Sequence, residues 1–331
     1  MNQPIVSVII PTYKRNDNLE RAINSVLNQT FDDLDIIVVD DNDETSVFRK
    51  NNENLMKKHE NNDKVIYLKH KENLNGAVAR NTGITYSKSK YIAFLDDDDE
   101  YLEKKLEYQI KLIEQLDNIW GGVYCGYSKF IKNTLLYRNL NSKYGDLKNE
   151  ILLLESPIGG CSTLLMKRSV LEELNGFDNS FYRHQDWELL IRFFRKYKIA
   201  FINRDLVKRH MDDRKNVANP EDLILTKKKF LNKFKIDIKE MPIELQKEVY
   251  KRHFLSITRS LIKNRNIKEA IKYYKKSKSF SDITLFDNIK IFVNLVDGII
   301  PIKYTLRKIT IKCLILLKLG NTHIRRILKD G

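Results

Sequence analysis

Four consecutive aspartates, at positions 96–99, directly follow the apolar run at 91–95. An apolar run closed by charge is typical of a central strand in a parallel sheet, and open α/β sheets bind ligands beyond the carboxyl ends of such strands. Carboxylates this close together raise one another's pKa unless a cation neutralises them, and Mg²⁺ and Mn²⁺ prefer oxygen ligands. The segment therefore indicates a site for a metal ion, which would in turn bind a phosphate group. The alternative is a solvated acidic turn that caps a helix starting near Leu102.

The first hundred residues supply the elements that would position these carboxylates. Apolar runs at 6–10, 36–39, 65–68 and 91–95 predict four buried strands, separated by helices that include 19–27 and 76–87. Right-handed crossovers place the carboxyl ends of such strands along one edge of the sheet. We therefore expect residues 11–15, 40–43 and 96–99 to face one another across one crevice.

The rest of the chain has weaker signals. Further strands are predicted at 122–125, 162–166, 199–202 and 206–207, with helices near 169–174 and 187–196. Residues 126–149 are polar and poorly patterned, and from Pro220 onward the pattern is helical and basic. These patterns predict an α/β fold with a mostly parallel sheet, followed by a basic helical extension over residues 221–331.

Composition narrows the class of protein. With 331 residues, of which 42% are hydrophobic and 31% charged, the chain is long enough for two domains and is not disordered. No apolar stretch approaches the roughly 18 residues of a membrane span, and the first residues lack a secretory signal, so we expect a cytoplasmic protein. Cys125, Cys161 and Cys313 have neither disulfide nor metal-site spacing and are expected to be core residues.

The net charge of +15 lies in the last third of the chain. Residues 1–220 hold 33 of the 59 basic and 33 of the 44 acidic residues, which leaves 26 basic against 11 acidic residues in 221–331. Apolar residues such as Phe286, Phe292 and those at 314–317 alternate with these lysines. This mixture is typical of helices that rest on an anionic membrane or pack on a second copy of the chain. An ordinary helical subdomain with solvated lysines is the alternative.

Five blocks in order carry a family resemblance: residues 6–13, 22–30, 38–41, 75–81 and 94–99. Together they resemble the family 2 inverting glycosyltransferases, which have the GT-A nucleotide-sugar fold, over roughly residues 5 to 215. The resemblance implies that residues 1–100 form the nucleotide-sugar-binding half and residues 101–220 the acceptor-binding half of a GT-A domain.

On the donor side, the resemblance implies that Pro11 and Tyr13 frame the base and that Asp41 accepts the uracil N3–H, which would select a UDP-sugar. Arg80 matches a residue that reaches the nucleotide or its diphosphate, where a guanidinium can pair with two phosphate oxygens. Without the resemblance, Tyr13 is a half-buried wall residue and Arg80 a surface salt-bridge partner.

The acidic block matches the family's DxD element. The resemblance implies that Asp98 binds Mn²⁺ or Mg²⁺ directly, that Asp96 contacts the ribose or a metal-bound water, and that Asp97 lies with them in the nucleotide site. His210 lies where many relatives have a mobile loop over the diphosphate, which makes it a candidate third metal ligand or phosphate donor. Taken alone, it is an ordinary surface histidine.

Inverting transfer needs a base, because the acceptor hydroxyl must lose its proton as the new C–O bond forms. Asp186 matches the base position of the family motif Glu-Asp-Trp, although Gln185 here replaces the Glu. The alternative is that Asp186 is only the N-cap of the helix at 187–196. The segments 159–163 and 176–178 also resemble segments that line the acceptor side.

The resemblance predicts a transferase that moves a sugar from a UDP-sugar to a hydroxyl of a glycan or lipid-linked oligosaccharide acceptor. Such relatives act in cell-surface polysaccharide synthesis at the inner face of the cell membrane. A metal-dependent nucleotidyltransferase or phosphohydrolase is less favoured, because hydrolases with an Asp nucleophile usually carry it after the first strand, where Pro11 stands here. A nucleic-acid-binding protein is disfavoured, because no recognised motif accompanies the lysines.

Overall fold

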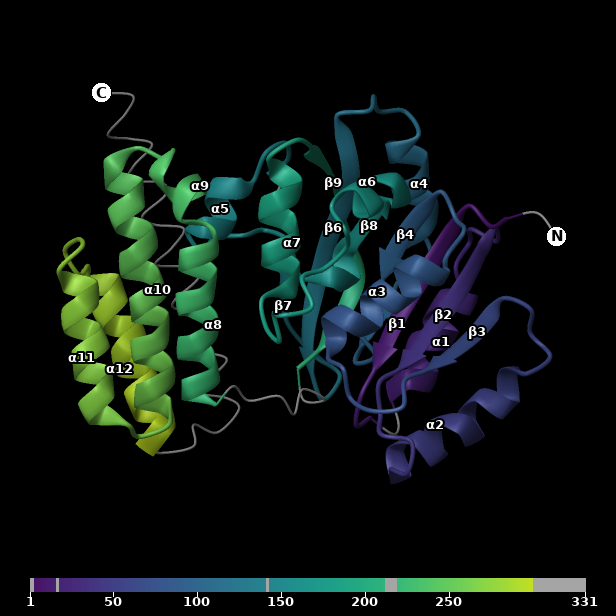
Figure 1. Ribbon diagram of the computed structural model, residues 1–331, viewed down its shortest axis with the longest axis horizontal. Coiled ribbons are helices and arrows are strands. Elements are labelled where there is room, and N and C mark those ends of the chain that lie inside the picture. The colour runs from purple at the N-terminus through teal and green to yellow at the C-terminus, as the bar shows by residue number, and fades with distance from the viewer. Residues whose placement is uncertain (1–2, 16–17, 141–142, 212–218, 300–331) are drawn as a thin grey trace. The chain divides into compact units, whose positions relative to one another are not determined.

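The computed structural model describes residues 3–15, 18–140, 143–211 and 219–299 (Figure 1). The chain forms two compact units, Met1–Val217 and Ala218–Gly331. The first is an α/β unit with a nine-stranded sheet, and the second consists of helices in its described part. The predicted fold class is therefore confirmed.

The four strands predicted in the first hundred residues are confirmed. They are β1 (Val6–Thr12), β2 (Leu34–Asp40), β3 (Val65–Lys69) and β4 (Tyr91–Phe94), which pair in parallel in the order β3-β2-β1-β4. The helices α1 (Asn18–Leu27), α2 (Val47–Met56) and α3 (Gly76–Tyr86) connect them. Because side chains on both faces of β1, β2 and β4 are buried, these strands read as continuous apolar runs.

Helix α2 has no apolar periodicity. Its buried residues are Arg49, Asn52 and Met56, so its inward face is largely polar. Ser46 caps its first turn by accepting a hydrogen bond from the Arg49 amide. A hydrophobic pattern could not have predicted a helix whose interior contacts are hydrogen bonds.

The second half of the sheet is mixed. The strand β8 (Leu164–Lys167) runs antiparallel to β4, and β6 (Trp120–Ile131) runs antiparallel to β8. The strand β9 (Lys198–His210) then lies parallel to β6. Parallel pairing thus covers the first four strands and the β6–β9 pair.

Several boundaries differ from those predicted. The two short strands expected at 199–202 and 206–207 are one strand, β9, with register shifts where it pairs with β6. The strand β5 (Asp99–Tyr101) was not predicted, and α4 (Lys105–Ile113) begins after Leu102, whose amide donates to the Leu206 carbonyl on β9.

The strand β7 (Thr134–Asn139) forms a hairpin with β6 and was not predicted either. Its turn residues, Lys132 and Asn133, both have positive φ, at 46° and 60°. Tight hairpins favour this geometry, but sequences usually mark it with glycine, and a Lys-Asn pair carries a weak signal. Two short helices complete this unit, α5 (Lys148–Leu152) and α6 (Arg168–Glu173), together with α7 (Gln185–Phe194).

The core of the first unit lies between the sheet and its helices. Val8, Ile10, Ile36 and Ala93 are fully buried in one apolar cluster. Cys125 and Cys161 are buried as predicted, whereas Cys313 lies outside the described residues.

The second unit contains α8 (Pro220–Lys233), α9 (Lys235–Lys239), α10 (Ile243–Lys263), α11 (Ile267–Lys278) and α12 (Leu285–Ile299). Helix α10 packs against α11 and α12 (Figure 1). Among the described residues, no helix is long and apolar enough to cross a membrane. The apolar run predicted at 314–317 lies outside the described residues.

Candidate active site

The acidic cluster lies where β4 ends and β5 begins. One carboxylate oxygen each from Asp96, Asp98 and Asp99 lies within 4.8 Å of the others. Asp98 and Asp99 are buried, and Asp96 is partly exposed. Three converging carboxylates form an oxygen donor set that suits Mg²⁺ or Mn²⁺, so these residues fit the predicted ion.

Three arginines from three different elements pair with the cluster. Arg15, after β1, lies 3.1 Å from Asp98 through Nη2, and Arg80, on α3, lies 2.6 Å from Asp96. Arg209, on β9, lies 3.4 Å from Asp99. The protein thus supplies part of the positive charge that packed carboxylates require.

Asp97 is oriented differently from its neighbours. It accepts a hydrogen bond of 2.8 Å from the Thr12 hydroxyl and lies 3.5 Å from Nε of Arg15. Burial, and then the adjacent Asp98 carboxylate, raise the pKa of Asp97 to about 7. Asp97 is not among the three converging carboxylates, and it ties the acidic segment to the end of β1.

The end of β1 contacts the acidic segment through Thr12 and Arg15, and the end of β2 lies next to β1, because the Asp41 amide donates to the Thr12 carbonyl. Pro11 lies beyond the last β1 residue that pairs with β4, so its missing N–H removes no hydrogen bond on that side. Tyr13 is half-buried, and the Lys14 ammonium lies 4.9 Å from the centre of its ring. These positions fit the predicted base-framing roles, which stay predictions.

Asp41 is held by a segment that precedes α3. Its carboxylate accepts hydrogen bonds from the Leu74 and Asn75 amides and from the Asn73 side chain, at 2.8, 2.9 and 2.8 Å, and contacts Nδ1 of His70 at 2.7 Å. Both oxygens therefore already bind protein donors. The predicted uracil contact stays a prediction, and it would have to share an oxygen with one of these donors.

Asp40 was not singled out from the sequence, yet it organises this strand end. Its fully buried carboxylate lies 3.2 Å from Nε of Arg49 and accepts hydrogen bonds from Asn52 and Tyr67. Arg49 in turn donates to the carbonyls of Asp40 and Asn42. This network fixes the backbone that presents Asp41.

Arg80 links the cluster to the helix that carries Asp186. Besides Asp96, its guanidinium donates to Oε1 of Gln185 at 2.8 Å and to the Gly76 carbonyl at 3.1 Å. Gln185 is the first residue of α7, so one guanidinium connects β4, α3 and α7. The substitution of Gln for the family's Glu therefore gives Arg80 a neutral partner at this position.

Asp186 lies in the first turn of α7 and is not its N-cap, so the N-cap alternative is wrong. The helix begins at Gln185, and the N-cap is His184, which has a left-handed φ of 58° and stacks its ring on Trp187 at 4.1 Å. Burial raises the pKa of Asp186, against the opposing effects of the Trp187 amide and the Arg80 charge. A carboxylate of raised basicity near the cluster can accept a proton from a hydroxyl group.

His210 contacts Glu100 and not the converging carboxylates. Its Nε2 lies 3.3 Å from Oε2 of Glu100, and this contact, with a smaller contribution from Lys208, lowers the pKa of Glu100 to about 2. The predicted ligand role of His210 stays a prediction. The neighbouring Arg209, which pairs with Asp99, was not singled out from the sequence. Two adjacent basic residues on a strand do not reveal which of them faces the acidic cluster.

The predicted acceptor segment approaches Arg209. Gly160 has a φ of 97°, and a Cβ atom added there would lie 3.6 Å from the Arg209 guanidinium. At Gly159, an added Cβ would lie 2.3 Å from the ring of Tyr127. Position 160 therefore favours glycine because of its positive φ, whereas position 159 needs glycine because a Cβ atom there would clash with the Tyr127 ring.

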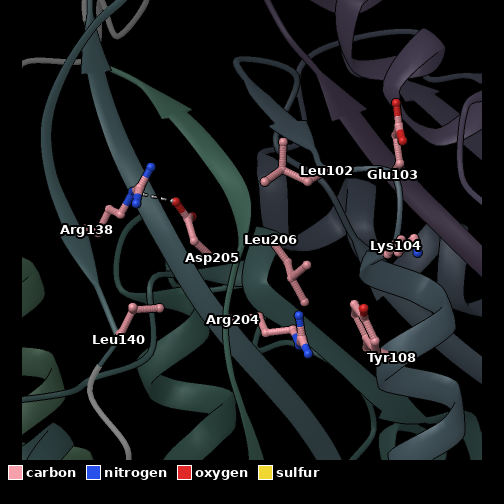
Figure 2. A pocket seen from close by; sticks show the side chains of 9 residues that line it. All are labelled: Leu102, Glu103, Lys104, Tyr108, Arg138, Leu140, Arg204, Asp205 and Leu206. Atoms are coloured by element: carbon pink, nitrogen blue, oxygen red, sulfur yellow. Dashed lines mark ion pairs between the residues drawn. The ribbon is translucent and has the colours of Figure 1, made fainter.

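A cavity of about 540 Å³ lies apart from these residues. Figure 2 shows Arg138 directed toward Asp205 on one side and Arg204 beside Tyr108 on the other, with the guanidinium 4.6 Å from the centre of the ring. None of the predicted site residues lines this cavity. We therefore place the candidate active site at the acidic cluster.

The family model for "Glycosyl transferase family 2" matches residues 7–175, about half of the chain, and the chain belongs to this family.

Two curated relatives are similar to part of the chain. An uncharacterized glycosyltransferase of Rickettsia prowazekii is 36% identical over 212 residues, which are 62% of this chain and 63% of that protein. The amylovoran biosynthesis glycosyltransferase AmsB of Erwinia amylovora is 29% identical over 222 residues, covering 62% of this chain and 69% of that protein. The chain thus matches less than two thirds of the Rickettsia protein's length.

Two solved structures share the fold. TarS 1-349 of S. aureus in complex with UDP-GlcNAc has a TM-score of 0.58 at 14% identity and covers 88% of both chains. The mannosyltransferase PcManGT of Pyrobaculum calidifontis, in complex with GDP-Man and Mn²⁺, has a TM-score of 0.54 at 16% identity and covers 97% of this chain and 88% of that chain.

Proposed function

We propose that this protein is a metal-dependent inverting glycosyltransferase that moves a sugar from a UDP-sugar to a hydroxyl of a glycan or lipid-linked oligosaccharide. The observation that carries the proposal is the Arg80 bridge. It joins Asp96 of a three-carboxylate donor set to Gln185, the residue next to Asp186. A cation site for a diphosphate and a basic carboxylate for an acceptor therefore belong to one connected arrangement.

Asp98, with Asp96 and Asp99, would hold the Mn²⁺ or Mg²⁺ ion. When bound, such an ion neutralises the charge that develops on a departing diphosphate. Pro11, Tyr13 and Asp41 would bind the nucleotide, and Asp97 would keep the acidic segment on β1.

Asp186 would act as the base. In a single displacement, its carboxylate takes the proton from the acceptor hydroxyl as the oxygen attacks the anomeric carbon. Arg80 holds the start of α7 through Gln185, and so fixes the orientation of Asp186.

A binding experiment first tests two points: which nucleotide the donor carries, and whether its binding requires a metal ion. The relative TarS binds UDP-GlcNAc, whereas PcManGT binds GDP-Man with Mn²⁺, so both nucleotides belong in the test. We expect calorimetry to show UDP binding in Mn²⁺ that is lost in EDTA and in Asp98→Ala, with weaker binding of GDP. UDP bound equally tightly with and without metal would contradict the proposal.

A panel of nucleotide sugars, assayed for donor hydrolysis and for transfer, then identifies the sugar. Hydrolysis of a nucleoside triphosphate in place of a nucleotide sugar would favour the phosphohydrolase alternative.

The second unit would hold the enzyme at its acceptor on the inner face of the cell membrane, in polysaccharide synthesis. The name of AmsB, an amylovoran biosynthesis glycosyltransferase, supports the biosynthetic part of this proposal. On α11, the half-exposed Ile267 and Ile271 lie beside the exposed Lys268, Lys272 and Lys275. Anionic lipid attracts such a surface by about 1 kcal/mol per basic residue. Assembly with a second copy is the alternative for this surface.

A further inference from the structure

The Asp98 carboxylate has two uses in this structure. It is one of the three converging carboxylates, and it is also the ion-pair partner of Arg15 at 3.1 Å. The side chains are only 12% and 7% exposed, so salt screens this pair weakly. A divalent ion that binds Asp98 must therefore compete with a well-shielded guanidinium.

We propose that Arg15 is a resident counter-cation of the site, and that a divalent ion binds Asp98 by displacing the Arg15 guanidinium. This inference rests on the proposed function. Two cations on one carboxylate repel each other, and in a partly buried site that repulsion is strong. Breaking the contact between Arg15 and Asp98 is then part of the free energy of binding the ion.

Arg15 has a second carboxylate partner, Asp97, 3.5 Å from its Nε, whereas the other two arginines are held by contacts outside the acidic segment. Arg80 also donates to Gln185 and to the Gly76 carbonyl, and Arg209 lies 5.4 Å from the centre of the Tyr127 ring. These contacts would keep both guanidinium groups in place when an ion arrives.

The backbone on the N-terminal side of Arg15 is anchored. Lys14 has a left-handed φ of 54°, and its amide donates to Oδ1 of Asn42 at 2.8 Å. Displacement of Arg15 therefore requires rotation of its side chain and no movement of β1.

A displaced guanidinium would stay tethered to the loop after β1, close to the acidic segment that would hold the ion. It can then pair with phosphate oxygens, for which its planar fork is suited. Arg15 thus opposes the binding of the ion alone and supports the binding of the nucleotide with the ion. Loss of Arg15 should therefore strengthen the binding of the ion alone and weaken the binding of the nucleotide. A variant that fails to fold would instead weaken both kinds of binding.

The experiment compares full-length wild type, Arg15→Gln and Arg21→Gln. Arg21 donates to the main-chain carbonyl of Asp98 at 3.1 Å, so its variant removes an equal charge close to the same residue but leaves the carboxylate alone. Mn²⁺ affinity without nucleotide is measured by electron paramagnetic resonance, and UDP affinity in saturating Mn²⁺ by calorimetry.

We expect Arg15→Gln to bind Mn²⁺ about tenfold more tightly and UDP about tenfold more weakly, the scale of one charge-assisted pair. Arg15→Lys should lie between wild type and Arg15→Gln, and Arg21→Gln should change both affinities less than Arg15→Gln does.

Mn²⁺ binding by Arg15→Gln that is equal to or weaker than wild type would overturn the inference, as would an equal gain in Arg21→Gln. Tighter Mn²⁺ binding with unchanged UDP binding would support the displacement and overturn the phosphate contact. If UDP binding by the wild type does not depend on a metal ion, the proposed function is wrong. If the wild type binds UDP in a metal-dependent manner but Arg15→Gln has an unchanged Mn²⁺ affinity, the proposed function stands and only the role of Arg15 is wrong.

Discussion

Nη2 of Arg80 lies 2.6 Å from Oδ1 of Asp96, and Nη1 of the same guanidinium lies 2.8 Å from Gln185. The two nitrogens therefore bind two elements that are far apart in the sequence. The predicted role of Arg80, a contact to the nucleotide or its diphosphate, would compete with both of these contacts. In the proposed reaction, we accordingly assign Arg80 a positioning role between the metal carboxylates and the base.

Arg80→Lys tests this role. Lysine keeps the charge but lacks the fork, so it can reach Asp96 or Gln185 but not hold both. We expect transfer to fall by roughly 10²-fold, the size of a small misplacement of reacting groups, while UDP affinity in Mn²⁺ changes little. A large loss of UDP affinity with the residual turnover unchanged would instead indicate direct diphosphate binding.

Asp186→Asn should abolish most transfer and spare donor binding. The change removes the base but keeps a side chain of similar shape in the first turn of α7. We expect a decrease of about 10²–10⁴-fold in kcat, with an unaltered UDP dissociation constant. Glu20→Gln, at a half-exposed carboxylate on α1, serves as the matched control. Near-normal transfer by Asp186→Asn would leave Asp186 with a purely structural role.

The raised pKa of Asp186 predicts two pH effects of known sign. Only the ionised base is active, so kcat/KM should rise with pH through a pKa above the usual 3.8 of an aspartate. Because the folded state disfavours the ionised form, ionisation lowers the free energy of unfolding once the pH exceeds the unfolded pKa. Asp186→Asn should therefore be at least as stable as wild type at neutral pH, with the difference vanishing in acid. Urea denaturation at several pH values measures this.

Removal of the Asp40 carboxylate should destabilise the first unit. Asp40→Ala leaves Arg49 buried without its ionic partner, and breaking such a pair costs about 3–5 kcal/mol. The matched control is Asp32→Ala, which breaks an exposed pair with Lys64 and should change stability by less than about 0.5 kcal/mol. Chemical denaturation followed by circular dichroism compares the two variants. An equal loss of unfolding free energy in both variants would show that the buried Asp40 network stabilises the protein no more than an exposed ion pair does.

Charge reversal on α11 tests the membrane proposal in the full chain. We expect wild type to float with anionic liposomes at low salt and to be released at high salt, because the attraction is screened within a Debye length. Lys268→Glu combined with Lys272→Glu should abolish flotation without affecting donor hydrolysis. Wild type that ignores liposomes, together with a variant that loses its oligomeric state, would identify α11 as an assembly surface.

The sequence predicted the parallel strands and their shared edge well, because both faces of these strands are buried and apolar. It predicted poorly those elements whose formation depends on distant partners or on polar contacts, such as β5 and α2. Among the site residues, the acidic segment was visible as a run of charge, whereas Arg15, Asp40 and Arg209 were not singled out. The sequence around a charged residue does not show which opposite charge the side chain will contact, and that partner becomes known only from the fold.

The pairing of β5 with β9 has a consequence for how the protein is assembled during synthesis. Strands β1 to β4 pair among themselves, so this half of the sheet can form soon after residue 94 emerges from the ribosome. The strand β5 pairs with β9, in a register that places Asp99 opposite Arg209, and β9 is synthesised about a hundred residues later. Pairing across so long a loop is slow. The acidic segment is therefore held by its neighbours on one side long before the other side is closed, and we expect the complete site to be among the last features that the nascent chain acquires.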